Sequence, residues 1–464
     1  MQGTVWGSLC CTVSMDKLGQ HVYKNKDLLY RYKGEVEIPS LGMVDDIMTI
    51  QKCSNDSVKI NAVVNAFVEA KKLRLSKDKC HKIHIQKNNN QNKECLKLKV
   101  HNEDMSDSAK ERYLGDIVDS SGKIRSTVEE RRNKGFGMVA EILAIVNDIP
   151  LGQYKMEIGL KLRQAMLLNG LLFNSEAWHD ITEAEIKLLE AVDEHLLRSL
   201  VGGHAKTPLE FLYLEAGAIP IRFILSCRRM IYLQAILKRD DEELTKRVYR
   251  SQKQSPIKGD FFNLVKKDFD TIGQSINEDE ITAKSKEMHK SDIKSKIKTA
   301  AFQYLREKQS GHSKVRDIAY EKLETQRYMT SPLFTNQEMR LLFAMRSKAL
   351  DCRTNFKNRY RNDDLLCEIC LEEDDDQPHI MRCKPVNSKL KSQDVTRGLA
   401  KYEDIYGDPH KQKVISVLFT QLLEIRKTMV EDNRQNTPDP SISAEMLKTS
   451  YDLQPCTVNY SSRT

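Results

Sequence analysis

Residues 42–50 have the sequence GMVDDIMTI, in which two adjacent carboxylates, Asp45 and Asp46, lie between two short apolar runs. The runs, 41–44 and 47–50, predict two buried strands of a tight hairpin with both aspartates at its tip. Two carboxylates about 4 Å apart repel by on the order of 1 kcal/mol in water and about 4 kcal/mol when half-buried. A bound divalent cation would turn this repulsion into attraction, so the pair predicts a metal site. The alternative is an ordinary turn whose carboxylates point into water.

The sequence around this hairpin continues as an α+β pattern over residues 1–125. SNDS at 54–57 is a good helix start, and the apolar residues of the helix that follows share one face. Alternating residues within 80–86 and 96–101 predict two half-buried strands. Residues 113–124 predict a further hairpin whose turn contains Gly122.

From residue 126 onward the strand patterns almost disappear. Ser126 and Glu129 have capping-box spacing and predict a helix that ends near Asn147. Four more helices are predicted between 154 and 238, and 251–292 is polar enough to predict a linker interrupted by short helices. The predicted domains after 1–125 are a helical region over 126–250, a linker with basic helices over 251–350, a cysteine-containing module over 351–430 and a disordered tail over 431–464.

The length and composition of the chain are those of a globular protein. With 464 residues it can form two to four domains, and 30% charged against 40% hydrophobic residues predict a soluble, helix-rich fold. Lysine and arginine outnumber aspartate and glutamate by 74 to 66, which gives a formal net charge of +8. This modest excess permits a nucleic-acid partner without requiring one.

No segment of the sequence predicts a membrane span or a signal peptide. There is no run of about 18 apolar residues, and the apolar residues 5–15 lack the basic flank and cleavage site of a secretory signal. The 11 cysteines are odd in number and cluster only within 352–383, which is typical of reduced thiols, some of them holding metal. We therefore expect an intracellular protein, nuclear or cytoplasmic and not secreted, with no membrane partner.

A helix over residues 290–308 carries separate basic and apolar stripes. The stripes repeat every four residues and consist of Lys290, Lys294 and Lys298 on one side and Ile293, Ile297 and Ala301 on the other. The basic stripe fits a nucleic-acid surface, although a solvated helix face is the more common explanation.

A second candidate metal-binding cluster has the spacing C-x2-C-x8-H-x3-C. It consists of Cys367, Cys370, His379 and Cys383. Two thiolates two residues apart can form half of a tetrahedral site, and His379 and Cys383 lie one helical turn apart. Three thiolates and one imidazole suit Zn²⁺, whose binding releases on the order of 10 kcal/mol that also folds the segment. Because four protein ligands leave no open position, we predict structural zinc.

The surroundings of this cluster leave its partner open. The acidic run 372–376 is unfavourable for phosphate, so nucleic acid would sooner meet the cations just upstream, Arg353, Lys357, Arg359 and Arg361. Cys352 is a poorer candidate ligand because of its distance from Cys367 along the chain. A small zinc-stapled module that binds only protein is the alternative.

Taken together, the pieces resemble the reverse transcriptase of non-LTR (LINE-type) retrotransposons from the middle of its polymerase domain onward. The resemblance covers about 380 residues and depends on the order and spacing of motifs that are each short. The matching segments are the Gln2-Gly3 turn, Met43-Val44-Asp45-Asp46, the helix at 57–71, Leu75–Cys80 with Lys79, Tyr113-Leu114-Gly115, the helices of 126–240 with Asn174–Trp178, and the Cys-Cys-His-Cys module.

The resemblance implies an α+β partial palm of hairpins plus a helix, followed by a mainly α-helical thumb and connection and a small CCHC zinc module. It also implies RNA-directed DNA synthesis by two-metal nucleotidyl transfer, with an RNA template and a DNA primer as partners. Asp45 would be a principal Mg²⁺ ligand and Asp46 a supporting one. Nucleotide and primer contacts would come from Gln2, Gly3, Lys79, Tyr113, Leu114 and Gly115.

The chain departs from the family pattern in three ways. Met43 stands where an aromatic residue is usual, and Thr4–Cys10 replaces a usual Ser-Pro. The family's other metal-binding aspartate and its fingers precede the Gln-Gly segment, and no aspartate precedes Gln2 here. The expectation is therefore a truncated reverse transcriptase that does not polymerise by itself. The alternative is a non-catalytic nucleic-acid-binding protein derived from a mobile element.

Overall fold

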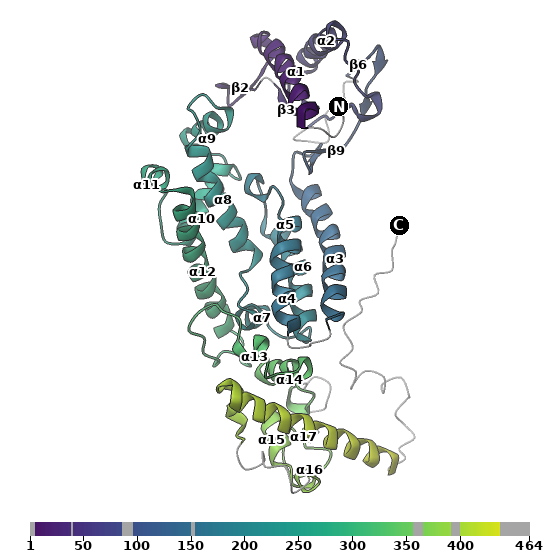
Figure 1. The fold of residues 1–464 in the computed structure, drawn as a ribbon, viewed down its shortest axis with the longest axis vertical. Coiled ribbons are helices and arrows are strands. Elements are labelled where there is room, and N and C mark those ends of the chain that lie inside the picture. The colour runs from purple at the N-terminus through teal and green to yellow at the C-terminus, as the bar shows by residue number, and fades with distance from the viewer. Residues whose placement is uncertain are drawn as a thin grey trace. The chain divides into compact units, whose positions relative to one another are not determined.

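A computed structural model describes residues 5–38, 40–85, 96–149, 154–355, 365–390 and 400–436 (Figure 1). Within these ranges the chain is rich in α-helix, and its short strands pair only as two-stranded sheets. This composition is compatible with the predicted α+β class. None of the helices in the described part of the chain is long and apolar enough to span a membrane.

The chain forms two compact units, and each unit is assembled from three separate segments. Unit 1 consists of Met1–Arg131, Leu172–Leu188 and Leu225–Ser295. Unit 2 consists of Arg132–Leu171, Leu189–Ile224 and Lys296–Thr464.

All the strands of the described residues lie in the first segment of unit 1. Four pairs, β1–β2, β3–β4, β6–β7 and β9–β10, are antiparallel, and β5 pairs with β8 in parallel. The bounds are β1 Tyr30–Tyr32, β2 Val36–Ile38, β3 Leu41–Met43, β4 Asp46–Met48, β5 His81–Lys82, β6 Lys99–Val100, β7 Glu103–Asp104, β8 Ser106–Asp107, β9 Lys110–Tyr113 and β10 Asp116–Asp119. The strands predicted within 80–86 and 96–101 are thus only two residues long each, and the loop between them falls largely outside the described residues.

The hairpin predicted over 113–124 forms around a different turn. Strands β9 and β10 are joined by Leu114 and Gly115, and Gly122 lies beyond the end of β10. Both turn residues have positive φ, at 49° and 91°, as a two-residue hairpin with the right-handed twist of its strands requires. The prediction missed this turn because a leucine rarely adopts such a conformation.

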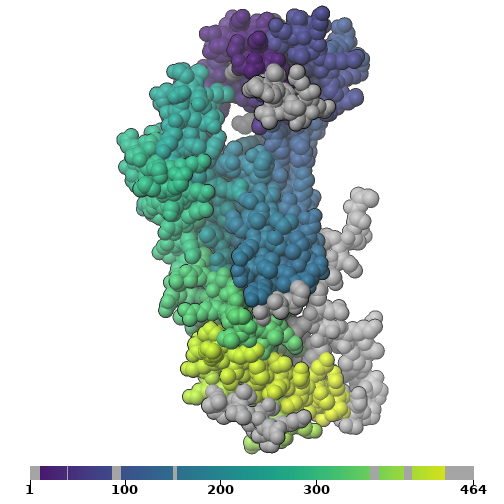
Figure 2. Space-filling model, in the orientation of Figure 1, coloured from purple at the N-terminus to yellow at the C-terminus, as the bar shows by residue number. Residues whose placement is uncertain are grey.

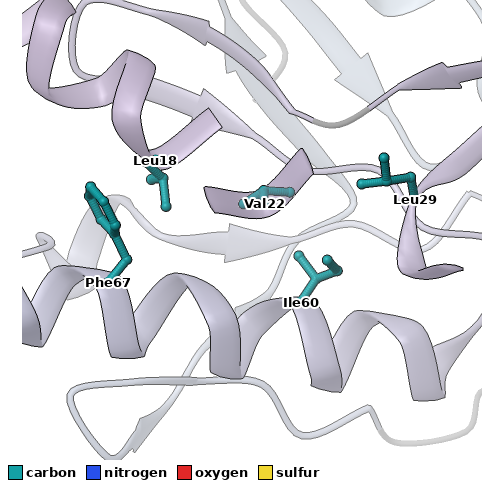
Figure 3. Close-up of a cluster of buried hydrophobic side chains, with 5 residues drawn as sticks. All are labelled: Leu18, Val22, Leu29, Ile60 and Phe67. Carbon is teal, nitrogen blue, oxygen red and sulfur yellow. The ribbon is translucent and has the colours of Figure 1, made fainter. Parts of the chain in front are cut away.

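The core of the first segment lies between α1 (Val5–Tyr23) and α2 (Ser54–Ala70). Figure 3 shows its fully or almost fully buried side chains, which are Leu18, Val22, Leu29, Ile60 and Phe67. Partly buried Val63 and Val64 complete the predicted apolar face of α2, and Ile47 of β4 packs against the same cluster. Burial of each large side chain contributes about 1.5–3 kcal/mol, so this core holds the β3–β4 hairpin against the two helices.

Two helices from the third segment of unit 1 pack through a buried ion pair, and one of them lies in the region predicted as a linker interrupted by short helices. Arg229 of α8 (Ile221–Leu237) donates to both carboxylate oxygens of Asp268, at 2.7 and 2.8 Å. Ser226 donates to the same carboxylate at 2.6 Å, which satisfies it inside the protein. The short helices predicted within 251–292 are present, but their buried polar pairs were not predicted, because residues that pair in the interior have the composition of an exposed segment. The remaining helices of this region are α9 Leu244–Gln254, α10 Phe261–Thr271, α11 Glu278–Ala283 and α12 Lys286–Ser310.

The basic and apolar stripes predicted for 290–308 are present on α12. Ile293, Ile297 and Ala301 are buried, whereas Lys290 and Lys294 are exposed. The four-residue spacing therefore identified the packed face of this helix correctly.

Unit 2 is helical. Its segments include most of α3 (Arg125–Asn147) and α6 (Glu183–Val201), and a π-helical turn at 163–167 interrupts α4 and α5. Its other helices are α4 Lys155–Leu162, α5 Leu168–Leu171, α7 Leu209–Ala216, α13 Arg327–Thr330, α14 Asn336–Arg346, α15 Gln377–Arg382, α16 Lys384–Ser388 and α17 Pro409–Asn436.

Two buried carboxylates organise this helical unit. Asp193 accepts both donors of Arg163, at 2.6 and 2.7 Å, and the hydroxyl of Tyr213 at 2.8 Å. Glu215 is bonded by Arg346 and by two tyrosine hydroxyls. Burial, followed by the charge of Glu215, raises the pKa of Tyr328 well above its ordinary value, so this hydroxyl keeps the proton that it donates.

Two further predictions differ from the structure. Ser126 does not form a capping box with Glu129, because its hydroxyl donates to Asp119 at 2.5 Å instead. The tail predicted as disordered from 431 begins with helix, since α17 continues to Asn436. Residues 437–464 lie outside the described ranges.

Candidate metal centre and acidic hairpin

Four side chains of unit 2 come together as the sequence spacing predicted. The donor atoms of Cys367, Cys370, His379 and Cys383 all lie within 4.8 Å of one another. The Sγ atoms of Cys367 and Cys383 are 4.0 Å apart, and the Sγ of Cys370 is 3.4 Å from the Nε2 of His379. Tetrahedral ligands about 2.0–2.3 Å from Zn²⁺ would be separated by roughly 3.5–3.7 Å, so the cluster fits this ion.

Local backbone geometry brings the two halves of the cluster together. The N–H of Cys367 donates to the carbonyl of Glu373 at 2.8 Å, and Leu371 has a positive φ of 55° that turns the chain back. The second half is carried by α15, whose N-cap Asp376 accepts from the His379 N–H at 2.6 Å. Cys383 immediately follows this short helix, which places it one turn after His379.

The imidazole of His379 is oriented for metal binding. Its Nδ1 lies 3.1 Å from the Oε2 of Glu373, and its Nε2 faces the Cys370 thiol. A carboxylate on one ring nitrogen fixes the tautomer and leaves the other nitrogen's lone pair for the metal. Glu373 belongs to the acidic run, so the run has a role in supporting the site.

The thiols differ in how readily they lose their protons. Burial raises the pKa of Cys370, but hydrogen bonds from the backbone N–H groups of Glu372 and Glu373 outweigh it and leave this pKa below its ordinary value. Burial and the neighbouring thiolates of Cys367 and Cys370 raise the pKa of Cys383 to about 12. Three thiolates therefore need a cation beside them, and binding of Zn²⁺ would release protons.

Other residues near the module do not join the cluster. Cys352 is buried and bonds to Thr354, and burial raises its pKa to about 11, which makes it an inert thiol. Arg353 forms an ion pair with Glu368 at 2.7 Å. The other predicted phosphate contacts, Lys357, Arg359 and Arg361, lie outside the described residues.

The acidic hairpin forms where it was predicted, with a shifted turn. Val44 and Asp45 make the turn, and Asp46 is the first residue of β4, opposite Met43. Val44 has a positive φ of 56°. Both aspartates are exposed and Met43 is 59% exposed, so the strands are not buried as expected. They are short and end before the core, which only Ile47 of the pair reaches.

Two other elements hold this hairpin in unit 1. The thiol of Cys11 on α1 donates to the carbonyl of Val44 at 3.7 Å. The hydroxyl of Tyr113 donates to the carbonyl of Leu41 at 2.9 Å. Burial, and to a smaller degree the charge of Asp46, raises the pKa of Tyr113. The Tyr-Leu-Gly turn and the Asp-Asp hairpin are thus neighbours, although many residues separate them in the chain.

Three residues that sequence reasoning did not single out for this site support the turn at Leu114-Gly115. The amide of Asn174 donates to the Leu114 carbonyl at 3.0 Å, and Arg131 donates to the Gly115 carbonyl at 2.7 Å. The guanidinium of Arg131 stacks over the ring of Phe173, and its Cζ is 5.3 Å from the ring centroid. The one local feature that marks Asn174 as unusual is its positive φ of 60°. A backbone angle cannot be read from the sequence, so these supporting residues could not be predicted.

The remaining predicted nucleotide and primer contacts are Gln2, Gly3 and Lys79. Gln2 and Gly3 lie outside the described residues, and Lys79 is exposed at the end of a 3₁₀ turn, Lys77–Lys79. Within the described ranges, the Cys-Cys-His-Cys cluster is the one group of three or more ligand side chains close enough to share an ion. Among the residues that the structure describes, no third ligand side chain lies close enough to Asp45 and Asp46 to share an ion with them.

Comparison with models of protein families gave no match. Searches against curated proteins and against solved structures likewise found no similar protein. The chemistry of the two sites must therefore be argued from their own residues.

Proposed function

We propose that this chain carries the metal-binding hairpin, the primer-positioning turn, the helical thumb and the zinc module of a non-LTR reverse transcriptase. The contact between Tyr113 and Leu41 is the observation that carries the proposal. It joins the two motifs that in such an enzyme must act on the same primer end, the Asp-Asp hairpin and the Tyr-Leu-Gly turn. The function is then to hold an RNA template and a DNA primer for RNA-directed DNA synthesis.

Asp45 and Asp46 would hold Mg²⁺ in this function. Their exposed carboxylates are the hard oxygen ligands that Mg²⁺ prefers, and the ion usually completes its shell with water and substrate phosphates. An ion held by these two carboxylates would favour ionisation of the attacking 3′ hydroxyl of the primer and stabilise the leaving pyrophosphate. The pair supplies part of a two-metal ligand set, so we expect binding rather than polymerisation from these 464 residues.

The turn at Leu114-Gly115 is suited to close approach by a nucleic-acid backbone. Leu114 is 39% exposed, whereas the space that a side chain at Gly115 would occupy is filled by Phe173, 3.1 Å from the ideal Cβ position. The carbonyls of both residues are already bonded by Asn174 and Arg131, which fixes the turn before any ligand arrives. A preformed turn loses less conformational entropy on binding.

Fluorescence anisotropy with a labelled RNA–DNA template–primer, with and without Mg²⁺, tests the proposal. We expect Mg²⁺ to strengthen binding to the full chain, and the double substitution Asp45→Asn/Asp46→Asn to abolish that gain. The matched control is Asp104→Asn/Asp107→Asn, which removes two exposed carboxylates elsewhere in the same unit. Equal Mg²⁺ dependence in all three proteins would refute the role of the hairpin.

A second candidate function is non-catalytic nucleic-acid binding by the zinc module. A hollow of about 360 Å³ lies beside the metal cluster and combines two cations with apolar and polar side chains. Its lining residues are Met381, Arg382, Lys384, Asn387, Ser388 and Leu418. The cations could bind phosphate while the apolar residues contact a base or sugar.

This second function predicts a different binding profile. Affinity for single-stranded RNA or DNA should fall with salt, and Arg382→Ala/Lys384→Ala should weaken binding and reduce the salt dependence by about two phosphate contacts. Binding should not respond to Asp45→Asn/Asp46→Asn. Unchanged affinity and salt slope in the Arg382 and Lys384 variant would exclude the hollow as the site.

A further inference from the structure

The C-terminal helix α17 contributes a buried cation to the Cys-Cys-His-Cys cluster. Arg426 is only 7% exposed, although its guanidinium is always charged. One of its nitrogens donates to the Oδ2 of Asp375 at 2.7 Å, and another lies 3.9 Å from the Sγ of Cys367. The partners are 51 and 59 residues away in the sequence, so no local motif would have indicated them.

Asp375 connects Arg426 to the loop between the two ligand pairs. It is almost completely buried, and its Oδ2 also accepts from the N–H of Arg353 at 2.9 Å. Its own N–H donates to Leu365 at 2.7 Å, and its carbonyl accepts from the Thr354 hydroxyl at 2.8 Å. A single carboxylate therefore ties the metal loop, the segment before it and α17 together.

The charges around the cluster explain why a cation belongs at this position. Zn²⁺ with three thiolates and a neutral imidazole has a net charge of about −1, and Asp375 adds another negative charge within the same buried region. Arg426 lies between a ligand thiolate and this carboxylate. The charge of Arg426 therefore faces a site whose net charge would be negative with metal bound.

Helix α17 is also packed against the module through apolar side chains. Ile415, Phe419 and Leu422 are fully buried, and the helix contacts α14, α15 and α16 (Figure 1). Figure 2 shows the opposite side of α17, in yellow, along the molecular surface. Removal of Arg426 from its site would thus have to displace a helix that forms one wall of the module.

We propose that Arg426 is a positioning residue that couples metal occupancy of the Cys-Cys-His-Cys cluster to docking of α17. Metal binding makes the docking of α17 on the module more favourable. Docking of α17 in turn raises the affinity of the cluster for the metal. The two effects are equal in free energy because binding linkage is reciprocal. The inference is independent of the function proposed above.

The test measures metal release and helix docking in the full chain. Arg426→Gln should release zinc to a chelator about 10–100 times faster than the wild type. It should also shift the thiolate-to-cobalt charge-transfer band of the Co²⁺-substituted protein, because a hydrogen bond to a ligand sulfur is lost. Arg426→Lys keeps the charge and should restore part of the wild-type retention, and it serves as the second variant if Arg426→Gln does not fold.

Hydrogen exchange over residues 409–433 gives the reciprocal measurement. Removal of zinc by a chelator should speed hydrogen exchange in these residues in the wild type. The increase in exchange rate should be smaller in Arg426→Gln, because this variant has already lost the coupling between the metal and α17. Lys411→Gln removes an exposed cation from the same helix and should behave like the wild type. The proposal is overturned if the wild type binds no zinc, if folded Arg426→Gln retains zinc normally, or if chelation leaves exchange in α17 unchanged.

Discussion

The Cys-Cys-His-Cys cluster and the Asp-Asp hairpin both follow from short sequence motifs, yet they differ in how complete they are. The cluster gathers all its donor atoms within 4.8 Å and adds a carboxylate for its histidine and a buried arginine for its thiolates. The hairpin exposes two carboxylates that no third ligand side chain of the described residues joins. Its supporting contacts reach the backbone of Leu41 and Val44 rather than the aspartates.

This difference shows what each kind of metal site demands of the chain. A closed structural site can be built from a loop and one helical turn, so its four ligands and the carboxylate that orients its histidine are close in sequence, whereas Arg426 comes from a distant helix. The proposed site for nucleotide chemistry would have to keep positions open for substrate and water, which fits the exposure of both aspartates. Substitutions in the cluster should therefore have larger effects on the protein than substitutions of the two aspartates.

Loss of a cluster ligand should have the largest effect. Cys367→Ser leaves three ligands for an ion whose binding contributes on the order of 10 kcal/mol of apparent free energy, so bound zinc should fall from about one equivalent to almost none. Metal analysis of the purified protein gives the stoichiometry. Cys53→Ser, at an exposed cysteine outside the cluster, should keep a full equivalent. Full zinc content in Cys367→Ser would show that the cluster is not the zinc site.

Asp119 of unit 1, unlike the exposed hairpin aspartates, has a buried carboxylate with hydrogen-bond partners, and its ionisation should make the free energy of unfolding depend on pH. Asp119 accepts from the Ser121 N–H at 2.7 Å and the Ser126 hydroxyl at 2.5 Å, and Lys110 lies 3.5 Å away. Burial opposes ionisation, but these hydrogen bonds and this charge lower the pKa of Asp119 to about 2. Because the unfolded state binds the proton more tightly, the free energy of unfolding should decrease as pH falls from about 4 to about 2.

Urea unfolding measures this contribution. Asp119→Asn should lose about 1–2 kcal/mol at pH 6, and the difference from the wild type should shrink near pH 2.5. Asp107→Asn, whose carboxylate is largely exposed, should lose little at either pH. A pH-independent loss in Asp119→Asn would show that its ionisation does not contribute.

The contact between the two hairpins of unit 1 should have a smaller effect. Tyr113→Phe removes the hydroxyl that donates to Leu41, which should lower the free energy of unfolding by about 1 kcal/mol. Tyr23→Phe is the control because this ring is 40% exposed on α1. Equal stability of the two variants would mean that the hairpins do not support each other through this bond.

Substitution of the two aspartates should have the smallest effect on stability. Since both carboxylates are exposed, Asp45→Asn/Asp46→Asn should change the free energy of unfolding by less than about 0.5 kcal/mol. Thermal and urea unfolding without divalent cations are the measurements. A loss of more than about 1 kcal/mol would give the pair a structural role and weaken the contrast with the cluster.

Patterns that repeat within one element could be predicted from the sequence. The apolar face of α2, the stripes of α12 and the four ligands of the cluster all depend on neighbours no more than nine positions apart along the chain. The existence of both hairpins was predicted for the same reason. Each of these features is decided by neighbours along the chain, whose geometry is fixed by the helical or strand repeat.

Features that depend on distant residues could not be predicted. Arg229 with Asp268 and Arg426 with Asp375 are buried pairs, but each residue alone resembles a solvated surface charge. The turn at Leu114 requires a conformation that leucine adopts only when the surrounding contacts impose it. Ser126 bonds to Asp119 rather than to Glu129 because β10 brings a carboxylate to the start of α3.

The assembly of unit 1 from three segments also has a consequence for synthesis of the protein. Its last segment ends at Ser295, whereas its first segment ends at Arg131. At roughly 5–20 residues per second, a ribosome needs about 10–30 s to make the intervening chain. During that interval the nascent first segment can form its α1–α2 core but not its contacts with the last segment, such as the bond from Gln252 to the Tyr32 hydroxyl. Ribosome-bound chains that stop before residue 225 should therefore be more sensitive to protease in this segment than chains extended well past Ser295.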